Sequence, residues 1–496
     1  MSENISFFPT SPPADMPKKS VLGQYMTPPS IAAFMASLFR TPMSEHIRFL
    51  DAGAGKGALA NAFLQACSAN SVSRPVRIDL YEIDSAFIPE LKLNIAEYSN
   101  IKNIQVNIFN YDFIEESSNR LCENHELYTH SMLNPPYRKL NSKSVHSKLL
   151  KNADLHSANL YTAFLSIAIR LTKDDGEIVS IIPRSFCNGL YHKKFREFLT
   201  KNCSIKHIHL FKSRTKTFNE YNILQENIIV LLQKNLKQEK VTISISTDGS
   251  FDDYKQEIVN FSEIIHPDDL NKFIRIPIAG SIRTPLDVKT SLHDLSIEVS
   301  TGPVVDFRAL DFLHHMPEEG DAPLVYPGHL NGATEWPKAA FKKPNAIKLC
   351  PQTTTMLYPS GFYVAIRRMS SKEEKRRIVA HLINPDDFYG YSHLGFENHL
   401  NVIHCKKKGL EEFLARGIVG YLNSSYVNSL FHCFNGHTQV NATDLRSIKY
   451  PSRNILTRLG KWMKSKAEVV PIVQTGNSGF LACLFPYQAA FNNPCS

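Results

Sequence analysis

The chain has 496 residues, of which 43% are hydrophobic and 21% charged, with a formal net charge of +9; this is typical of a two- or three-domain soluble globular protein able to bind a polyanion. No run of 18 apolar residues occurs and the polar first 20 residues lack the apolar core of a secretory signal, so we expect a cytoplasmic protein without a membrane span. The nine cysteines form no Cys-x-x-Cys pair and no zinc-like cluster, so we expect reduced thiols and no metal site.

Strand-like and helix-like segments alternate between about residues 45 and 235. The predicted helices are Pro29–Phe39, Ala58–Ala69, Ala158–Leu171 and Lys193–Thr200. The predicted strands are Ile47–Leu50, Arg77–Tyr81, Ile104–Ile108, Ser131–Leu133, Glu177–Ile182, Ile205–Phe211 and Asn227–Leu232. Most of these strands are rich in Ile, Val or Leu, as strands buried on both faces of a parallel sheet are. The pattern predicts an α/β fold with a seven-stranded, doubly wound sheet. The last two strands have no helix between them, which predicts an antiparallel hairpin at one edge.

After about residue 240 the alternation weakens, prolines become frequent and strand-like runs such as Gly361–Arg367 lack paired helices. We therefore predict a second domain of the α+β class. The predicted boundaries are a flexible N-terminal arm over 1–20, the α/β domain over 21–237, a connecting segment over 238–283, the α+β domain over 284–455 and a tail without sustained period over 456–496.

A glycine-rich loop, Asp51-Ala52-Gly53-Ala54-Gly55-Lys56-Gly57, follows the first predicted strand and precedes a helix. Glycines let the backbone approach a ligand closely. The spacing matches neither the Gly-x-x-x-x-Gly-Lys-Ser/Thr phosphate loop nor the Gly-x-Gly-x-x-Gly dinucleotide fingerprint. The acid at its head favours a ligand that carries a cation or hydrogen-bond donors over a pyrophosphate.

Two further acids follow the next two strands. Glu82 ends the second strand and can accept hydrogen bonds from both hydroxyls of a ribose. Asp112 follows the third strand and can accept from an adenine amino group while Ile83 or Phe113 packs on the ring. Each acid alone is more often a helix cap or a turn residue. Together they predict an adenosine site, because ligands of open α/β sheets bind at the carboxyl ends of the strands.

Asn134-Pro135-Pro136-Tyr137 follows the fourth predicted strand. Prolines fix φ and hold the preceding residue extended, so the carbonyl groups of Asn134 and Pro135 should point in fixed directions. An amide side chain, a rigid carbonyl and a flat aromatic suit a planar ring that carries an amino group. Alone, this stretch is equally compatible with a proline-rich turn and a packing Tyr.

The motif series resembles the gamma-class amino-methyltransferases of bacterial restriction–modification systems, which methylate the exocyclic amino group of adenine in DNA. The matching motifs, in chain order, are Gly23-Gln24-Tyr25-Met26-Thr27-Pro28-Pro29, Asp51–Gly57, Glu82-Ile83-Asp84, Asp112-Phe113 and Asn134–Tyr137. The resemblance covers most of residues 20–235 and continues more weakly in the second half. It implies a Rossmann-like, S-adenosylmethionine-dependent methyltransferase fold, followed by a target recognition domain.

The resemblance also implies roles for single residues. Thr27 and Asp51 would contact the methionine part of S-adenosylmethionine, beside the backbone of Gly53 and Gly55. The adenosine part would be held by Glu82, Asp112, Ile83, Phe113 and Phe164. Asn134, Pro135 and Tyr137 would act on the flipped-out base, with Phe218 as a second stacking aromatic and Tyr221 as its competitor.

Double-stranded DNA is the implied partner, together with a separately encoded restriction endonuclease, and we expect a monomer or a dimer. For DNA contact we single out the basic stretch around Arg367, Arg368, Lys375 and Arg376, and the polar side chains of His437, Gln439 and Asn441. The basic stretch is also compatible with a solvated helix face, because Glu373 and Glu374 are interleaved in it.

Three alternatives stay open at this point. Asn-Pro-Pro-Tyr also serves protein-glutamine and ribosomal-RNA methyltransferases, although those usually lack a second domain of this size. A non-catalytic DNA-specificity module would carry a vestigial cofactor site. A fused nuclease is disfavoured, because Glu373-Glu374-Lys375 has no Asp in the preceding few tens of residues.

Overall fold

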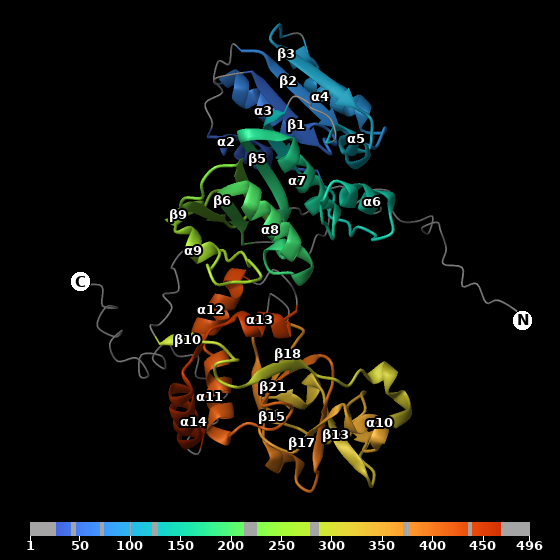
Figure 1. Cartoon of the computed structure of the whole chain (residues 1–496), viewed down its shortest axis with the longest axis vertical. Helices are drawn as coiled ribbons and strands as arrows, with labels where there is room; N and C mark the ends of the chain where they lie inside the picture. The colour runs from blue at the N-terminus through green and yellow to red at the C-terminus, as the bar shows by residue number, and fades with distance from the viewer. Residues whose placement is uncertain are drawn as a thin grey trace, which may run out of the picture. The chain divides into compact units, whose positions relative to one another are not determined.

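The computed structural model describes residues 26–40, 46–69, 74–99, 101–121, 127–212, 226–277, 287–370, 374, 376–434 and 439–467. The chain divides into two compact units, Met1–Gly280 and Ser281–Ser496 (Figure 1). Within the described residues, no helix combines the length and the apolar character needed to cross a membrane.

The first unit is built on a nine-stranded sheet of order β3-β2-β1-β4-β5-β7-β6-β8-β9. Its strands are β1 (Ile47–Ala52), β2 (Val76–Tyr81), β3 (Ile104–Phe109), β4 (Tyr128–Leu133), β5 (Thr172–Pro183), β6 (Cys203–Phe211), β7 (Asn227–Lys234), β8 (Val241–Ser246) and β9 (Lys255–Val259). The five strands β3, β2, β1, β4 and β5 are parallel, and β7 runs antiparallel between β5 and β6. All seven predicted strands are present and the α/β class is confirmed.

The predicted hairpin of β6 and β7 is antiparallel, but it does not lie at the edge of the sheet. Segment 238–283 does not merely connect the domains, because it supplies β8, which pairs with β6, and β9, which pairs with β8. In β8 the apolar side chains alternate with Thr242, Ser244 and Ser246. This strand is buried although its sequence is polar, because the Ser244 hydroxyl forms hydrogen bonds with the buried His207 and His209 of β6, at 2.6 and 2.8 Å.

Helices cover both faces of this sheet, as a doubly wound fold requires. One face packs against α2 (Pro29–Ser37), α3 (Ala58–Ala69) and α4 (Ile88–Ser99). The other face packs against α5 (Phe113–Arg120), α6 (Val145–Asn152), α7 (Leu160–Leu171) and α8 (Lys193–Asn202). The short α9 (Phe261–Ile264) and the 3-10 helices η1 (Arg184–Cys187) and η2 (Leu190–His192) complete the unit.

The second unit is α+β, as predicted. Its two larger sheets have the orders β11-β21-β18-β19 and β12-β16-β13-β20-β17. The strands of the unit are β10 (Val288–Thr290), β11 (Glu298–Thr301), β12 (Leu313–His314), β13 (Asp321–Val325), β14 (Leu330–Asn331), β15 (Ala333–Thr334), β16 (Ala346–Lys348), β17 (Leu357–Pro359), β18 (Tyr363–Arg367), β19 (Ala380–Ile383), β20 (His393–Phe396), β21 (Leu400–His404) and β22 (Tyr450–Pro451). The helices are α10 (Pro351–Thr354), α11 (Glu412–Leu422), α12 (Ser425–Phe434), α13 (Ala442–Ser447) and α14 (Arg453–Ala467).

The prediction of a tail without period from residue 456 is wrong for its first part, because α14 continues to Ala467 and packs on α11. Two glycines make this contact close. A Cβ on Gly417 would lie 1.8 Å from the Leu456 carbonyl oxygen, and one on Gly460 would lie 1.8 Å from that of Phe413. The helices therefore meet backbone to backbone, a feature that apolar periodicity alone does not reveal.

Gly460→Ala should lower the unfolding midpoint of the second unit, at a cost of about 1–3 kcal/mol from overpacking. Both tryptophans of the chain, Trp336 and Trp462, belong to this unit. Their fluorescence during heating therefore reports on the second unit alone. Ser465→Ala, at an exposed position of α14, is the matched control and should change the midpoint little. An unchanged midpoint for Gly460→Ala would contradict the close contact of the two helices.

Candidate functional site

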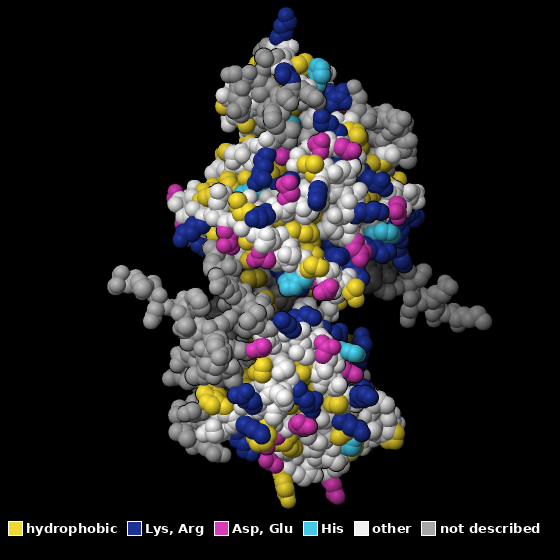
Figure 2. Space-filling model, turned by 60° about the vertical axis from the view of Figure 1, so that its left-hand side comes forward, with side chains coloured by type: hydrophobic (Ala, Val, Ile, Leu, Met, Phe, Trp, Pro, Cys, Tyr) yellow, Lys and Arg dark blue, Asp and Glu magenta, His cyan; other side chains and the backbone are white. Residues whose placement is uncertain are grey.

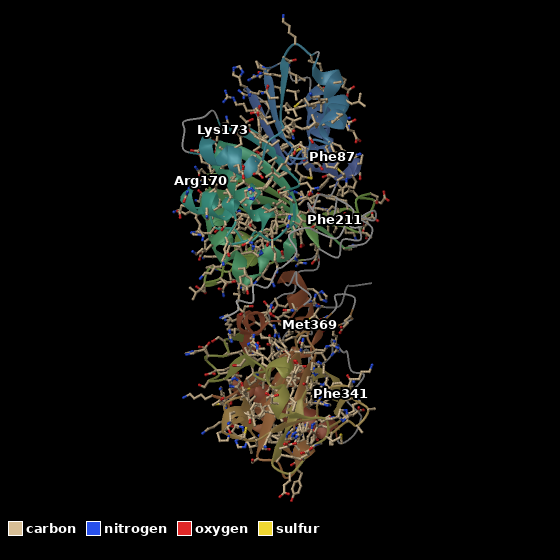
Figure 3. The ribbon with its side chains drawn as sticks, turned by 90° about the vertical axis from the view of Figure 1, so that its right-hand side faces the viewer. Phe87, Arg170, Lys173, Phe211, Phe341 and Met369 are labelled. Carbon is tan, nitrogen blue, oxygen red and sulfur yellow. The ribbon has the colours of Figure 1, made fainter. Side chains whose placement is uncertain are left out.

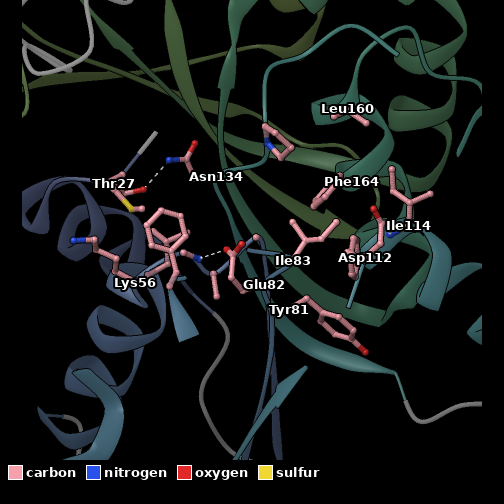
Figure 4. A pocket seen from close by; sticks show the side chains of 18 of the residues that line it. Thr27, Lys56, Tyr81, Glu82, Ile83, Asp112, Ile114, Asn134, Leu160 and Phe164 are labelled. Carbon is pink, nitrogen blue, oxygen red and sulfur yellow. Dashed lines mark hydrogen bonds between the residues drawn. The ribbon is translucent and has the colours of Figure 1, made fainter. Parts of the chain in front are cut away.

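A pocket opens at the carboxyl ends of β1, β2, β3 and β4, with about 1140 Å³ of empty space that includes open solvent (Figure 4). The structure brings most of the predicted site residues together there: Thr27, Gly53, Gly55, Glu82, Ile83, Asp112, Phe113, Asn134 and Phe164 all line it. Asp51, Pro135 and Tyr137 are not part of the lining, and Phe218 and Tyr221 lie outside the described residues.

Glu82 ties the glycine-rich loop to the end of β2. Its Oε2 accepts a hydrogen bond from the Gly55 backbone amide at 2.7 Å, drawn as a dashed line in Figure 4, and its Oε1 accepts from the Asp84 amide at 2.7 Å. Burial raises the pKa of Glu82, while these amides act in the opposite direction. Gly55 has φ +53°, in the left-handed region, and a Cβ there would lie 3.3 Å from the Met26 sulfur. The loop therefore takes a shape that glycine allows and that the carboxylate holds.

Asp51 is completely buried at the end of β1. Neither of its carboxylate oxygens makes a hydrogen bond with the described residues. Burial and the nearby Glu82 raise the pKa of Asp51 to about 8, although the Ala60 backbone amide opposes the shift. Since buried charges in proteins are normally paired, this carboxyl group fits a ligand that brings a cation, such as the ammonium of a methionine moiety.

The opposite end of the pocket suits a flat ring. Ile83, whose side chain is 55% exposed, follows β2, and Phe164 comes from α7 with its ring 5.1 Å from that of Phe113 (Figure 4). Asp112 caps α5, because its Oδ1 accepts from the Ile114 and Glu115 amides at 2.8 and 3.1 Å. Its Oδ2 lies 3.1 Å from His146 Nε2. A ring with an amino group can therefore lie between apolar side chains with an acid at its edge.

Asn134 is held in one orientation by two hydroxyl groups. Its Nδ2 donates to Thr27 Oγ1 at 2.9 Å, the dashed line between these residues in Figure 4. Its Oδ1 accepts from the Tyr137 hydroxyl at 3.1 Å. The Tyr137 hydroxyl also lies 3.4 Å from the Ile181 carbonyl oxygen, and its ring packs edge-on against Tyr161. Tyr137 is only 9% exposed, so stacking of a base on its ring stays a prediction.

Several side chains of the lining were not predicted to belong to the site, among them Met26, Phe87, Tyr111, Arg138 and His146. Met26, Tyr111 and Arg138 are direct neighbours of predicted residues, so widening each motif by one position would have included them. His146 comes from α6 and reaches the pocket through its contact with Asp112, which no sequence spacing indicates.

In the second unit, the basic stretch is largely tied to the protein itself. Arg367 pairs with Glu374, while Arg368 and Arg376 donate to the carbonyl oxygens of Asn398 and Asn423 at 2.7 and 2.9 Å. Arg377 is 1% exposed and bonds Ser370. Lys375 lies outside the described residues. The prediction of phosphate contacts at this stretch therefore has less support than its charge indicated.

The two predicted DNA-contact stretches nevertheless lie side by side. The Val440 amide donates to the Arg368 carbonyl oxygen at 2.7 Å, and Met369, labelled in Figure 3, pairs with Gln439. Gln439 is exposed. The backbone amide of Asn441 donates to the Asp444 side chain in a capping box that begins α13. His437 is outside the described residues.

Comparison with known proteins identifies the family. Residues 74–218 match the model of the Eco57I restriction-modification methylases. The chain is 46% identical to the type II methyltransferase M.BsuBI of Bacillus subtilis over 467 residues, which cover 92% of this chain and 93% of that protein. The chain belongs to the type II methyltransferases of restriction–modification systems. It is also 39% identical to the type II methyltransferase M.PstI of Providencia stuartii, covering 88% of each chain.

The fold agrees with that of a solved structure. The type IIL restriction-modification enzyme MmeI in complex with DNA has a TM-score of 0.53 at 11% sequence identity, covering 91% of this chain and 71% of that chain. The family model and the two relatives confirm the predicted site-specific DNA methyltransferase of a restriction–modification system. Membership of a methylase family implies S-adenosylmethionine as the methyl donor, and the pocket fits this group at both ends.

Asp51→Asn should stabilise the ligand-free protein, and more so at high pH. The folded state holds the Asp51 proton up to about pH 8, whereas the unfolded chain releases it near pH 4. The stability of the wild type therefore falls over this window, and the Asn variant escapes that loss. Calorimetry at pH 5 and pH 8 checks this, with a midpoint increase that is larger at pH 8. If the Asn variant is no more stable than the wild type at pH 8, the folded protein must stabilise the ionised Asp51 carboxylate, and the prediction fails.

Glu82→Gln should weaken binding of S-adenosylmethionine by about tenfold or more. The Gln side chain has only one acceptor oxygen, so it cannot accept from both the Gly55 and Asp84 backbone amides, nor from both ribose hydroxyls. Isothermal titration calorimetry measures the dissociation constant. Glu239→Gln, at an exposed position before β8, serves as the control. An unchanged constant for Glu82→Gln would remove Glu82 from the site.

Proposed function

We propose that the chain transfers the methyl group of S-adenosylmethionine to the exocyclic amino group of an adenine flipped out of double-stranded DNA, and so protects host DNA from a cognate endonuclease. The observation that carries this proposal is the Asn134 side chain, which lies at the pocket edge with its amide oriented by Thr27 and Tyr137. Methylation of a ring carbon instead would call for a nucleophile that activates the ring, and no cysteine occurs among the described residues of the lining.

The cofactor supplies a methyl group on a positively charged sulfur. In this proposal Asp51 and Thr27 hold its methionine part beside the Gly53–Gly55 backbone. Glu82 holds its ribose. Asp112 accepts from its adenine amino group, and Ile83, Phe113 and Phe164 pack around that ring. The carboxyl groups are in place before the ligand arrives, so little rearrangement is needed on binding.

The base must leave the helix to reach the pocket, at a cost of a few kcal/mol. Stacking on an aromatic such as Tyr137 offsets about 1–3 kcal/mol of this cost. Since Tyr137 is buried in the structure, stacking requires its ring to become more exposed when the base enters. Phe218, or Tyr221 in its place, is proposed for the other face of the base.

Adenine's amino nitrogen is a weak nucleophile because its lone pair is delocalised into the ring. Asn134 Oδ1 and the carbonyl oxygen of Pro135 can accept its two hydrogens, which favours a pyramidal nitrogen and stabilises the positive charge that develops on it. The acceptors are fixed in advance by proline geometry and by the hydrogen bond from Asn134 to Thr27. The rate gain comes from this orientation together with in-line positioning.

The second unit is proposed to act as the target recognition domain, over about 284–455. Gln439 is exposed beside Met369 and is suited to reading a base edge. Asn441, Arg367, Arg368, Arg376, Lys375 and His437 remain candidates for DNA contact, the first four having bonds within the protein. A separately encoded endonuclease, a cytoplasmic location, and a monomer or dimer complete the proposal.

Asn134→Ala should lower kcat by at least 10³-fold while the dissociation constant of S-adenosylmethionine changes little, because the lost acceptor serves the transition state. Tyr137→Phe keeps the ring but loses the hydroxyl that orients Asn134, so it should be slowed less than Tyr137→Ala. The assay is methyl transfer to DNA from a host without adenine methylation, followed by mass spectrometry of the nucleosides.

The identity of the modified nucleoside decides the substrate. N6-methyladenine in one sequence context supports the proposal. N4-methylcytosine would show that the substrate base is cytosine, which also carries an exocyclic amino group, and Asn134 would keep the same role. Methyl transfer to RNA or protein but not DNA, or full activity of Asn134→Ala, would overturn it.

A further inference from the structure

The segment that follows Asn134–Tyr137 has an unusual charge. Residues 138–153 include Arg138, Lys139, Lys143, Lys148 and Lys151 but no Asp or Glu. All five of these side chains are exposed. The four lysines form no ion pair with the described residues, in contrast to Arg367 of the second unit. Figure 2 shows that on another face of the molecule Lys and Arg side chains lie among Asp and Glu, as on an ordinary solvated surface.

The segment is rigidly joined to the active site. The Leu160 amide donates to the Arg138 carbonyl oxygen at 2.8 Å, and Lys139 pairs with Asn159, so the start of the segment lies against the first turn of α7. Arg138 also lines the cofactor pocket. The distance along the chain from Tyr137 to Lys139 is only two residues. The first cations are therefore held directly beside Asn134–Tyr137, on which the proposed function places the target base.

The other end is also anchored. Ser144 caps α6 by accepting from the Ser147 amide at 3.2 Å, and Arg170 of α7 donates to the Ala153 carbonyl oxygen at 3.1 Å. Leu150 is buried in the core, whereas Lys148 and Lys151 are exposed and three residues apart, which places them on one face of the helix. Figure 1 shows α6 at the side of the first unit, beyond α7.

Acidic groups near α6 lie on its pocket side and just beyond its C-terminal end, where the exposed Asp154 pairs with His156 at 3.8 Å. His146 contacts Asp112 at 3.1 Å and Glu115 at 3.7 Å, so these carboxylates face the histidine on the pocket side of the helix. No ion pair joins either acid to the lysines within the described ranges. A rigid platform with outward cations next to a base-flipping site fits a chain of phosphates, which repeats negative charge along its length.

We propose that segment 138–151 is a phosphate clamp on the catalytic domain, in which Lys139, Lys143, Lys148 and Lys151 bind the DNA backbone beside the flipped nucleotide. The proposal rests on the DNA substrate of the proposed function but not on the identity of the modified base. Because phosphate contacts carry no sequence information, the clamp serves any site that the second unit selects.

The test compares two variants of equal charge. The first replaces Lys139, Lys143, Lys148 and Lys151 by Gln. The control replaces four other exposed lysines by Gln: Lys102, Lys201, Lys237 and Lys240. These precede β3, β6 and β8, so they lie at the amino ends of the strands, away from the pocket at the carboxyl ends. Fluorescence anisotropy with a random-sequence 30-base-pair duplex gives the dissociation constant at a series of salt concentrations.

The slope of log K against log salt should become shallower by about 2–4 in the first variant and by less than about 1 in the control, since each phosphate contact contributes about 0.9. The dissociation constant of S-adenosylmethionine should stay within about twofold in both. Equal slopes in the wild type and the first variant, or equal losses in both variants, would overturn the clamp.

Two pair variants guard against misfolding. If the fourfold variant loses cofactor binding, Lys139→Gln with Lys143→Gln and Lys148→Gln with Lys151→Gln carry the test, each with an expected slope change of about 1–2. The wild type's methylated nucleoside is identified in parallel. Absence of N6-methyladenine together with a lysine-dependent slope would reject the proposed base but keep the clamp. N6-methyladenine together with a slope that does not depend on the lysines would reject the clamp but keep the proposed base.

Discussion

The parallel pairing of β1 with β2 and β4 is the constraint on which the site depends. In this register Asp51 lies beside Leu80 and Met132, so Gly53, Glu82 and Asn134 follow at one level, each two residues further along its strand. Three segments far apart in the sequence thereby present a glycine, a carboxylate and an amide to one pocket. A slip of one residue in either pairing would turn these side chains to the other face of the sheet.

The register also explains a local conflict between stability and binding. Asp51 and Glu82 are both buried, and the charge of Glu82 adds to the burial that raises the pKa of Asp51. A protein optimised only for folding would not place two acids there. The fold tolerates them because the surrounding strands are apolar on both faces, and because backbone amides satisfy Glu82. The buried Asp51 carboxyl group therefore fits a positively charged group of a ligand.

Much of this was readable from the sequence. Strand ends that carry Asp51, Glu82, Asp112 and Asn134 in order predicted the pocket, since buried parallel strands are apolar runs followed by polar turns. The polar-looking strand β8 could not be recognised, because its serines are satisfied by histidines on a neighbouring strand. The helix α14 was missed although Leu456, Leu459 and Met463 recur at helical spacing and pack in the core; only the closeness of its contact with α11, which rests on glycines, needs the tertiary structure. Whether Arg367 faces DNA or Glu374 is likewise a tertiary question.

The orientation of the Asn134 amide has a consequence for which bases can be rejected. In the proposed reaction Nδ2 stays bound to Thr27, so the amide would present its oxygen and not its nitrogen to an incoming base. The Pro135 carbonyl adds a second acceptor. A base with a carbonyl group in place of an amino group, such as thymine, would place its oxygen against the Asn134 and Pro135 oxygens. No hydrogen would lie between these three acceptors. Selection against thymine would then arise from repulsion rather than from a lost contact, and Thr27, which touches no base in this arrangement, would be the residue that enforces it.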